Sequence, residues 1–257
     1  RRRGKAEGEV GGLLQKGMPR ARWRVESTLG GNNLQNVAMT RMNLGQYAKA
    51  EPYYTEALHL LRGKADGAEQ RLTLFVNAAR NSLFRQDVPR ARAFLDSAAR
   101  LAASAPLSTY LPVYHSVEGS YWQRLGKLSK ALQHFEIALQ EAKGLQRNDL
   151  VATILYDKYQ AYHQAGQQRE ALQALMAVLP YVEGKSLLRN KQLTYYNIAQ
   201  LYRQLGDFKA ATRWYEKHKL VSATLATEGG GARTWGLEQK YKTAEHTKQL
   251  LASTPTN

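Results

Sequence analysis

The chain has 257 residues, and 43% of them are hydrophobic, which is enough to bury a sizeable core in one or two domains. No apolar run approaches the roughly 18 residues that a membrane span needs, and the arginines in residues 1–24 are not followed by the apolar stretch of a secretory signal. We therefore expect a water-soluble chain. The absence of cysteine excludes disulfides and thiolate metal sites, but it leaves the compartment open.

The net charge of +16 comes from 37 basic and 21 acidic residues. Residues 1–24 hold eight lysines and arginines against two glutamates, so +6 of the charge lies there and the remaining +10 is spread without a dense run. Such a balance suits an acidic partner, an anionic membrane surface or nucleic acid. The even spread favours an ordinary solvated surface over a nucleic-acid footprint.

The organising feature of the sequence is a repeat of about 40 residues. Five marker positions follow one another at spacings of 41, 40, 40 and 40 residues, with an alanine five residues after each and a large apolar residue nine residues after each. The markers are Gly45, Gln86, Gly126, Gly166 and Gly206, the alanines are Ala50, Ala91, Ala131, Ala171 and Ala211, and the large residues are Tyr54, Leu95, Phe135, Leu175 and Tyr215.

Each marker separates two amphipathic helices. An apolar stripe of helical spacing precedes the marker, as at Tyr195, Ile198 and Tyr202, and the marker glycine ends this helix because glycine accepts the left-handed backbone conformation. No segment alternates with period two for long enough to form a strand. A single hairpin cannot bury its apolar faces alone, so successive hairpins must stack. The pattern predicts helices over residues 33–44, 47–62, 67–85, 88–103, 108–125, 128–143, 147–165, 168–182, 187–205 and 208–225.

These residues resemble the tetratricopeptide repeat family, which places a helix-ending glycine, two alanines and an aromatic residue at the same relative positions. The resemblance covers residues 30 to 225. It implies an all-α fold, a right-handed superhelical solenoid of about five stacked helical hairpins plus a C-terminal helix. The period of 40 departs from the family's usual 34 and is similar to that of its sensory and peptide-binding members. The second repeat, with Gln86 as its marker and Pro89 in its second helix, is the most degenerate.

The repeat divides the chain into three parts. Residues 1–32 are a basic, flexible flank or a decayed repeat, residues 33–225 are the repeat domain, and residues 226–257 contain a glycine-rich break followed by a charged helix. This helix is expected from about Arg233 to Leu251 and suits either a cap or a coiled coil that pairs two copies. Its stripe consists of Leu237, Tyr241, Ala244, Lys248 and Leu251.

The segment from Leu237 to Thr243 resembles the "Leu-Glu-x-Lys-Tyr-x-Thr" segment that follows tetratricopeptide arrays in sensor histidine kinases and helix-turn-helix regulators of the Bacteroidetes group. The resemblance implies that the chain is a sensory region. One alternative is that it forms the periplasmic part of a membrane-anchored protein. An ordinary solvated terminal helix is the competing interpretation.

Catalytic motifs are missing from the sequence. Gly184-Lys185-Ser186 matches the end of a phosphate-binding loop, but Leu179 stands where that loop needs its first glycine. The six histidines include no i, i+4 pair with a glutamate between them, and the carboxylates form no acid–base pair. We expect no enzymatic activity, no cofactor and no metal site.

Candidate binding residues lie on the first helices, which the family resemblance places on a concave inner face. Asparagines stand nine residues before three of the markers, and an asparagine side chain can bind a peptide amide through both its donor and its acceptor. The resemblance to peptide-binding members implies that role, and the alternative is that these groups are merely solvated or pair with each other. The candidate groove consists of Asn36, Asn77, Arg80, Tyr156, Gln160, His163, Tyr196, Asn197, Gln200 and Arg203.

The sequence therefore predicts a non-catalytic module that binds a protein or an extended peptide, with an acidic partner favoured by the charge. The first hypothesis is the sensory input domain of a bacterial signalling protein. The alternative is a constitutive scaffold or assembly adaptor. Nucleic-acid binding rests on charge alone and is disfavoured.

Overall fold

The computed structural model describes residues 20–62, 67–104, 109–183 and 188–228, and within these ranges it contains α-helices and no strand. The chain forms two compact units, residues 1–150 (unit 1) and residues 151–257 (unit 2). The helices are α2 (Arg20–Asn43), α3 (Tyr47–Leu60), α4 (Ala68–Phe84), α5 (Val88–Ser104), α6 (Leu111–Arg124), α7 (Leu128–Gly144), α8 (Asn148–Gln164), α9 (Gln168–Val182), α10 (Leu188–Gln204) and α11 (Phe208–Glu228).

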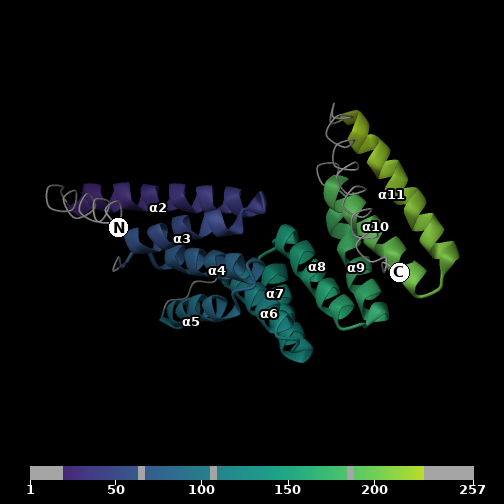
Figure 1. Cartoon of the computed structure of the whole chain (residues 1–257), viewed down its shortest axis with the longest axis horizontal. Coiled ribbons are helices and arrows are strands. Elements are labelled where there is room, and N and C mark those ends of the chain that lie inside the picture. The colour runs from purple at the N-terminus through teal and green to yellow at the C-terminus, as the bar shows by residue number, and fades with distance from the viewer. Residues whose placement is uncertain (1–19, 63–66, 105–108, 184–187, 229–257) are drawn as a thin grey trace, which may run out of the picture. The chain divides into compact units, whose positions relative to one another are not determined.

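Consecutive helices pair as hairpins in both units (Figure 1). Unit 1 holds the hairpins α2/α3, α4/α5 and α6/α7, and α4 also packs against α3 and α6. Unit 2 begins within α8 and contains the hairpin α10/α11, with α9 packed against α10. The expectation of an all-helical fold of stacked hairpins is confirmed within each unit.

All five markers end a first helix in the left-handed conformation. The backbone φ angle lies between 62° and 82° at Gly45, Gly126, Gly166, Gly206 and the non-glycine Gln86. At Gly206, for example, the amide donates to the carbonyl of Arg203 at 3.1 Å, and the next amide, of Asp207, donates to the carbonyl of Tyr202 at 3.0 Å. This pair of bonds is the Schellman motif, which satisfies the last carbonyls of a helix. The motif recurs at every marker, so the backbone conformation repeats with the same period as the sequence.

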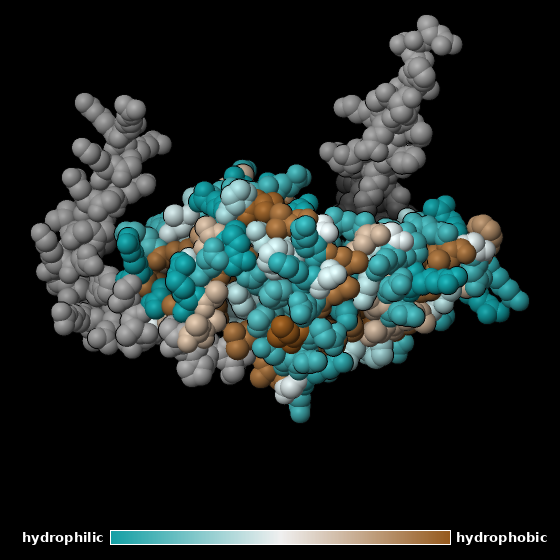
Figure 2. Space-filling model, turned by 90° about the horizontal axis from the view of Figure 1, so that it is seen from below, coloured by the Kyte–Doolittle hydropathy of each residue, from teal (hydrophilic) through white to brown (hydrophobic). Residues whose placement is uncertain are grey.

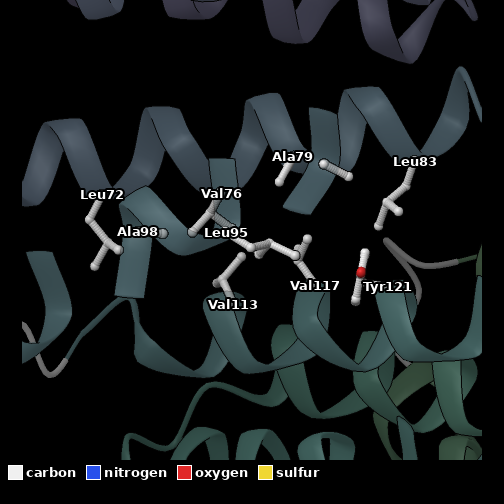
Figure 3. Packing of buried hydrophobic residues seen from close by; sticks show 10 residues of the cluster. Leu72, Val76, Ala79, Leu83, Leu95, Ala98, Val113, Val117 and Tyr121 are labelled. Atoms are coloured by element: carbon white, nitrogen blue, oxygen red, sulfur yellow. The ribbon is translucent and has the colours of Figure 1, made fainter. Parts of the chain in front are cut away.

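The repeat alanines and large apolar residues build the cores of the hairpins. All five alanines are 0–3% exposed, and four of the five large residues are 0–1% exposed. Figure 3 shows one such core, in which Leu72 and Val76 of α4 and Leu95 of α5 face Val113 and Val117 of α6. The stack in unit 1 is therefore held by a first helix that fills the groove of the preceding hairpin.

Gly119 marks the closest helix approach in unit 1. A Cβ atom at this position would lie 2.5 Å from Cε1 of Phe135, whose side chain is fully buried. Alanine stands at the same repeat position in three other repeats, as at Ala38, Ala79 and Ala199. The third repeat thus pairs the ring of Phe135 with a glycine, where other repeats have an alanine, and the smaller residue makes room for the ring.

The predicted helix ranges agree with the observed ones to within about three residues, except at the start. The first helix was expected at residue 33, but α2 begins at Arg20, because the helix continues into a stretch whose glycines had suggested a flank. The glycine-rich break and the segment Leu237–Thr243 lie outside the described residues. None of the described helices is long and apolar enough to cross a membrane.

Candidate functional site

The sequence-predicted binding residues fall at four repeat positions on the first helices, namely ten, nine, six and three residues before each marker. In unit 1 these positions provide Asn36 on α2 and Asn77 and Arg80 on α4. In unit 2 they provide two sets on neighbouring first helices. These are Tyr156, Gln160 and His163 on α8, and Tyr196, Asn197, Gln200 and Arg203 on α10.

The asparagines of unit 1 do not share one environment. Asn36 is exposed on α2. Asn77 is only 2% exposed, and its Oδ1 accepts a hydrogen bond from the hydroxyl of Tyr110 at 3.3 Å. The expectation that Asn77 faces an open groove therefore needs correction, because its amide is used to join two segments of unit 1 and is not presented to a ligand.

Arg80 lies half-buried near the hydroxyl groups of two tyrosines. Burial raises the pKa of Tyr54 to about 12, and the positive charge of Arg80 opposes that shift. Burial likewise raises the pKa of Tyr110, again against the charge of Arg80. Both phenols are therefore neutral at physiological pH, and the charge of Arg80 lies close enough to influence the pKa of each.

The two first helices of unit 2 are joined by a polar contact. The side-chain amide of Asn197 on α10 donates to the hydroxyl of Tyr156 on α8 at 3.0 Å. Both residues are half-buried, and the Asn197 carbonyl accepts no hydrogen bond from the described residues. The two groups are thus brought together, and the pair keeps an acceptor for a further donor.

Further polar groups follow along the same two helices. Gln160 and His163 on α8 are exposed, as is Arg203 on α10, while Gln200 is half-buried. The imidazole Nδ1 of His163 lies 3.0 Å from the Gln168 side-chain oxygen. We call the group on α8 and α10 the polar face of unit 2. It consists of Tyr156, Gln160, His163, Asn197, Gln200 and Arg203.

Tyr196 contacts the polar face through Gln200, but its ring lies against α11. Its ring lies 6.2 Å from that of Tyr215 and 5.5 Å from that of His218, both on α11, and its hydroxyl accepts a 2.7 Å hydrogen bond from Gln200. Tyr156 instead packs on Tyr159, with ring centroids 5.2 Å apart. The sequence left open whether Tyr156 and Tyr196 stack on one another, and the structure gives each of them other aromatic partners.

A buried ionic cluster in unit 1 went unnoticed in the sequence. Glu118 on α6 is 3% exposed, and its two oxygens accept from Arg92 of α5 at 3.2 Å and from the Tyr114 hydroxyl at 3.0 Å. Two imidazoles, of His115 and His134, stack nearby with centroids 5.8 Å apart. Because both carboxylate oxygens of Glu118 are engaged, this cluster is suited to holding α5, α6 and α7 together rather than to proton transfer.

Aligning the repeats at their markers could have revealed the buried cluster around Glu118. Eight residues before the marker, three other repeats carry the apolar residues Val37, Ala78 and Ile198, whereas the third carries Glu118. A carboxylate at a mostly apolar position needs a buried cation, and Arg92 stands one helix away. Across the described residues, no group of three or more histidine, aspartate or glutamate side chains is placed to hold a metal ion.

Large exposed hydrophobic residues are scattered over the described surface. In Figure 2 they form small groups between hydrophilic residues on the face shown. Exposed examples occur on several helices, including Leu44, Phe84 and Phe208. Single exposed apolar residues are ordinary in folded proteins and do not by themselves define a site.

Comparison with known proteins identifies the repeat. Two segments of the chain, residues 32–60 and 194–217, match the model of the tetratricopeptide repeat. No curated protein is significantly similar to the chain.

Several solved structures share the fold. BtubC (BKLC) from P. vanneervenii has a TM-score of 0.63 at 17% identity, over 80% of this chain and 91% of that one. A Rap protein complexed with Competence and Sporulation Factor has a TM-score of 0.67 at 16% identity, over 76% of this chain and 54% of that one. The Rap conjugation gene regulator of plasmid pLS20, complexed with the Phr* peptide, has a TM-score of 0.65 at 15% identity, over 94% of this chain and 63% of that one.

Proposed function

We propose, from the tetratricopeptide repeats that the chain carries, that it is a non-catalytic module that binds an extended peptide or protein segment on the polar face of unit 2. The observation that carries this proposal is the contact between Asn197 and Tyr156. It sets an amide and a phenol side by side on neighbouring first helices, with the Asn197 carbonyl directed to no described partner. A peptide amide could donate to that carbonyl.

The other groups of the polar face extend this recognition along the helices. Gln160 and Gln200 stand at the same repeat position, six residues before their markers, and each offers a donor and an acceptor. Arg203 and His163 lie one helical turn further, three residues before theirs. Asp157 of α8 stands at the repeat position of Asn197, so the positive charge of the face lies at the other end, at Arg203, and a segment that carries a carboxylate there fits it best.

The fold relatives support a peptide as the ligand class. One of them, the Rap conjugation gene regulator of pLS20, is seen with the Phr* peptide bound. At 15% identity this similarity concerns the fold alone, and the proposal for this chain rests on its own side chains.

We further propose that this module is the sensory input region of a bacterial signalling protein, as the segment Leu237–Thr243 suggests, and a constitutive scaffold is the alternative. The two differ in whether the bound ligand changes the conformation of the chain. Small-angle scattering with and without a bound peptide separates them. A ligand-dependent change supports a sensor, and an unchanged profile supports a scaffold.

The binding proposal is tested by selecting from a random displayed peptide library with the purified chain, in parallel with the Gln160→Ala/Asn197→Ala variant. The matched control is Asn36→Ala, which removes an exposed amide at the same repeat position as Asn197, but in unit 1. We expect a peptide class that the wild type and the control enrich and that the double variant loses. Equal enrichment by all three proteins, or none by any, would overturn the proposal.

A further inference from the structure

The turns within the three hairpins of unit 1 lie side by side. The ring of Tyr47, just after the turn between α2 and α3, stacks on that of Phe84, just before the turn between α4 and α5, with centroids 4.9 Å apart. The guanidinium of Arg124, just before the turn between α6 and α7, donates to the carbonyl of Leu83 at 3.2 Å. These two contacts place the three turns in one row along an edge of unit 1.

Large apolar side chains project from this row, one at each turn. Leu44 is 64% exposed, Phe84 is 50% exposed and Leu125 is 41% exposed. A Cβ atom added at the neighbouring markers Gly45 or Gly126 would meet no atom within 4 Å, so these turns border open space. Exposed apolar area is unfavourable in water, and here it is gathered on adjacent turns instead of scattered.

The same row carries an excess of positive charge. Seven lysines and arginines stand at the three turns, with Asp87 as the single acidic residue, in residues 41–49, 84–90 and 124–130. Glu51 of α3 pairs with two of these cations, Arg85 and Arg90. Among the described residues no ion pair neutralises the other five. The projecting apolar side chains are therefore flanked by cations that are available to an anionic partner.

The repeat itself does not require this composition. At the positions of Leu125 and Lys127, the turn between α8 and α9 of unit 2 carries Ala165 and Gln167. Its backbone nevertheless makes the same left-handed helix end at Gly166. The apolar and basic side chains at the turns of unit 1 are thus not needed to form a turn, which indicates a role of their own.

We propose that this edge of unit 1 docks on an anionic membrane surface. We call it the turn edge, and it consists of Leu44, Lys49, Phe84, Arg124, Leu125 and Lys127. A bilayer surface offers lipid headgroups to the cations and an apolar layer beneath them to the projecting side chains. Both kinds of side chain on the turn edge are satisfied by this one partner.

A membrane fits the turn edge better than a partner protein or a nucleic acid does. An acidic amphipathic helix would need a groove to receive its apolar stripe, whereas the side chains of the turn edge project from turns that border open space. A nucleic acid would neutralise the cations but leave the exposed leucines in water. This inference goes beyond ligand binding by unit 2 and does not depend on it.

Vesicle sedimentation of the full chain tests the apolar part of the turn edge, with phosphatidylcholine vesicles that contain or lack phosphatidylserine. The Leu44→Ser/Leu125→Ser variant removes two projecting side chains. Its matched control, Val37→Ser/Ile137→Ser, removes two side chains that are each 40% exposed but lie within α2 and α7. We expect the wild type and the control to bind only the phosphatidylserine vesicles, and the turn-edge variant to bind them about tenfold more weakly.

A second pair of variants tests the charge. Lys49→Gln/Lys127→Gln removes two cations near the starts of α3 and α7, and its control, Arg62→Gln/Lys143→Gln, removes two near the ends of the same helices. The two variants have the same net charge, so only the position of the charge differs. We expect the first to bind phosphatidylserine vesicles about tenfold more weakly and the control to stay close to the wild type.

Equal binding by a turn-edge variant and its control would overturn the proposal, as would binding that does not depend on phosphatidylserine, or no vesicle binding at all. Retention of the wild type on immobilised polyglutamate without vesicle binding would instead assign the turn edge to an acidic protein segment. Peptide selection separates this inference from the proposed function. The Leu44→Ser/Leu125→Ser variant should still enrich the peptide class, because the polar face of unit 2 is unchanged.

Discussion

Unit 1 and unit 2 use the same repeat positions in opposite ways. Ten and three residues before the marker, α4 carries Val76 and Leu83, which are 0% and 5% exposed. At the same positions α8 carries Tyr156, half-buried, and His163, exposed. The backbone of a repeat therefore fixes where a residue stands, and the side chain decides whether that position packs as an apolar residue or makes a polar contact, as Tyr156 does with Asn197 of α10.

Charge distinguishes α6 of unit 1 from α8 of unit 2 at a second position. Eight residues before the marker, unit 1 buries Glu118, whereas unit 2 has Lys158 at partial exposure. A buried carboxylate is tolerated only with a cation and a hydrogen-bond donor beside it, here Arg92 and Tyr114. Unit 1 should therefore be the part of the chain whose stability is sensitive to single charge changes.

The largest effect should come from removing the cation of this cluster. Arg92→Met leaves Glu118 buried without its ion pair, and we expect it to lower the free energy of unfolding by about 3 kcal/mol. Urea denaturation followed by circular dichroism measures the change. Asp96→Asn is the control, because Asp96 is Arg92's half-exposed partner and should cost less than about 1 kcal/mol. Equal effects of the two substitutions would contradict the assignment of Glu118 as the critical partner.

The next effect concerns the close helix approach in unit 1. Gly119→Ala puts a methyl group against the fully buried ring of Phe135, and such overpacking should cost about 2 kcal/mol. Adding Phe135→Leu, the residue type found at Leu95 and Leu175, should recover part of this loss. Gly166→Ala is the control, because a Cβ there meets nothing within 4 Å. It should cost only about 1 kcal/mol, from the positive φ.

The stability of unit 1 should also fall as the pH falls through the range in which histidine is protonated. Burial lowers the pKa of His115, as does the neighbouring His134, and burial likewise lowers the pKa of His134. Since both folded-state pKa values lie below the unfolded value of about 6.5, the neutral imidazoles stabilise the fold above that pH. That contribution is lost as the pH drops from the unfolded value towards the folded one.

Urea unfolding at pH 7.5 and pH 5.5 measures this dependence. The His115→Gln/His134→Gln variant should lose less stability between the two pH values than the wild type. An identical loss in both proteins would assign the pH dependence to other groups.

The smallest effect should be a gain in stability at the degenerate marker. Gln86 adopts a φ of 62°, whereas the two markers of unit 2 are glycines. Gln86→Gly relieves the left-handed strain of a side chain, partly offset by a more flexible unfolded chain. We expect a net gain of about 0.5 kcal/mol in urea denaturation. A loss of stability would show that the Gln86 side chain contributes more than its backbone costs.

The fold was predictable because its determinants are local and repeated. The markers, alanines and large apolar residues recur at fixed spacing, and each acts through its own hairpin. The start of α2 was not predictable, since the two glycines at 30 and 31 lie inside the helix against Leu60 and Leu61 of α3. Packing against a neighbouring helix overrides the poor helix propensity of glycine there.

The candidate site was predictable only in part. The repeat positions located the residues on first helices, but they did not predict the hydrogen bond between Asn197 and Tyr156. The solvent exposure of these residues could not be predicted from their repeat positions, because it depends on which neighbouring segment packs against each first helix. Asn77 and Asn197 stand at one repeat position, but Asn77 is buried under Tyr110 while Asn197 stays partly open.

The central claim is that the polar face of unit 2 binds a peptide. Its most direct test is hydrogen exchange of the wild-type chain with and without a peptide recovered from the library selection. We predict that the bound peptide slows exchange in α8 and α10 and leaves α2 and α4 unchanged. Protection confined to α2 and α4 would contradict the account and place the binding surface in unit 1.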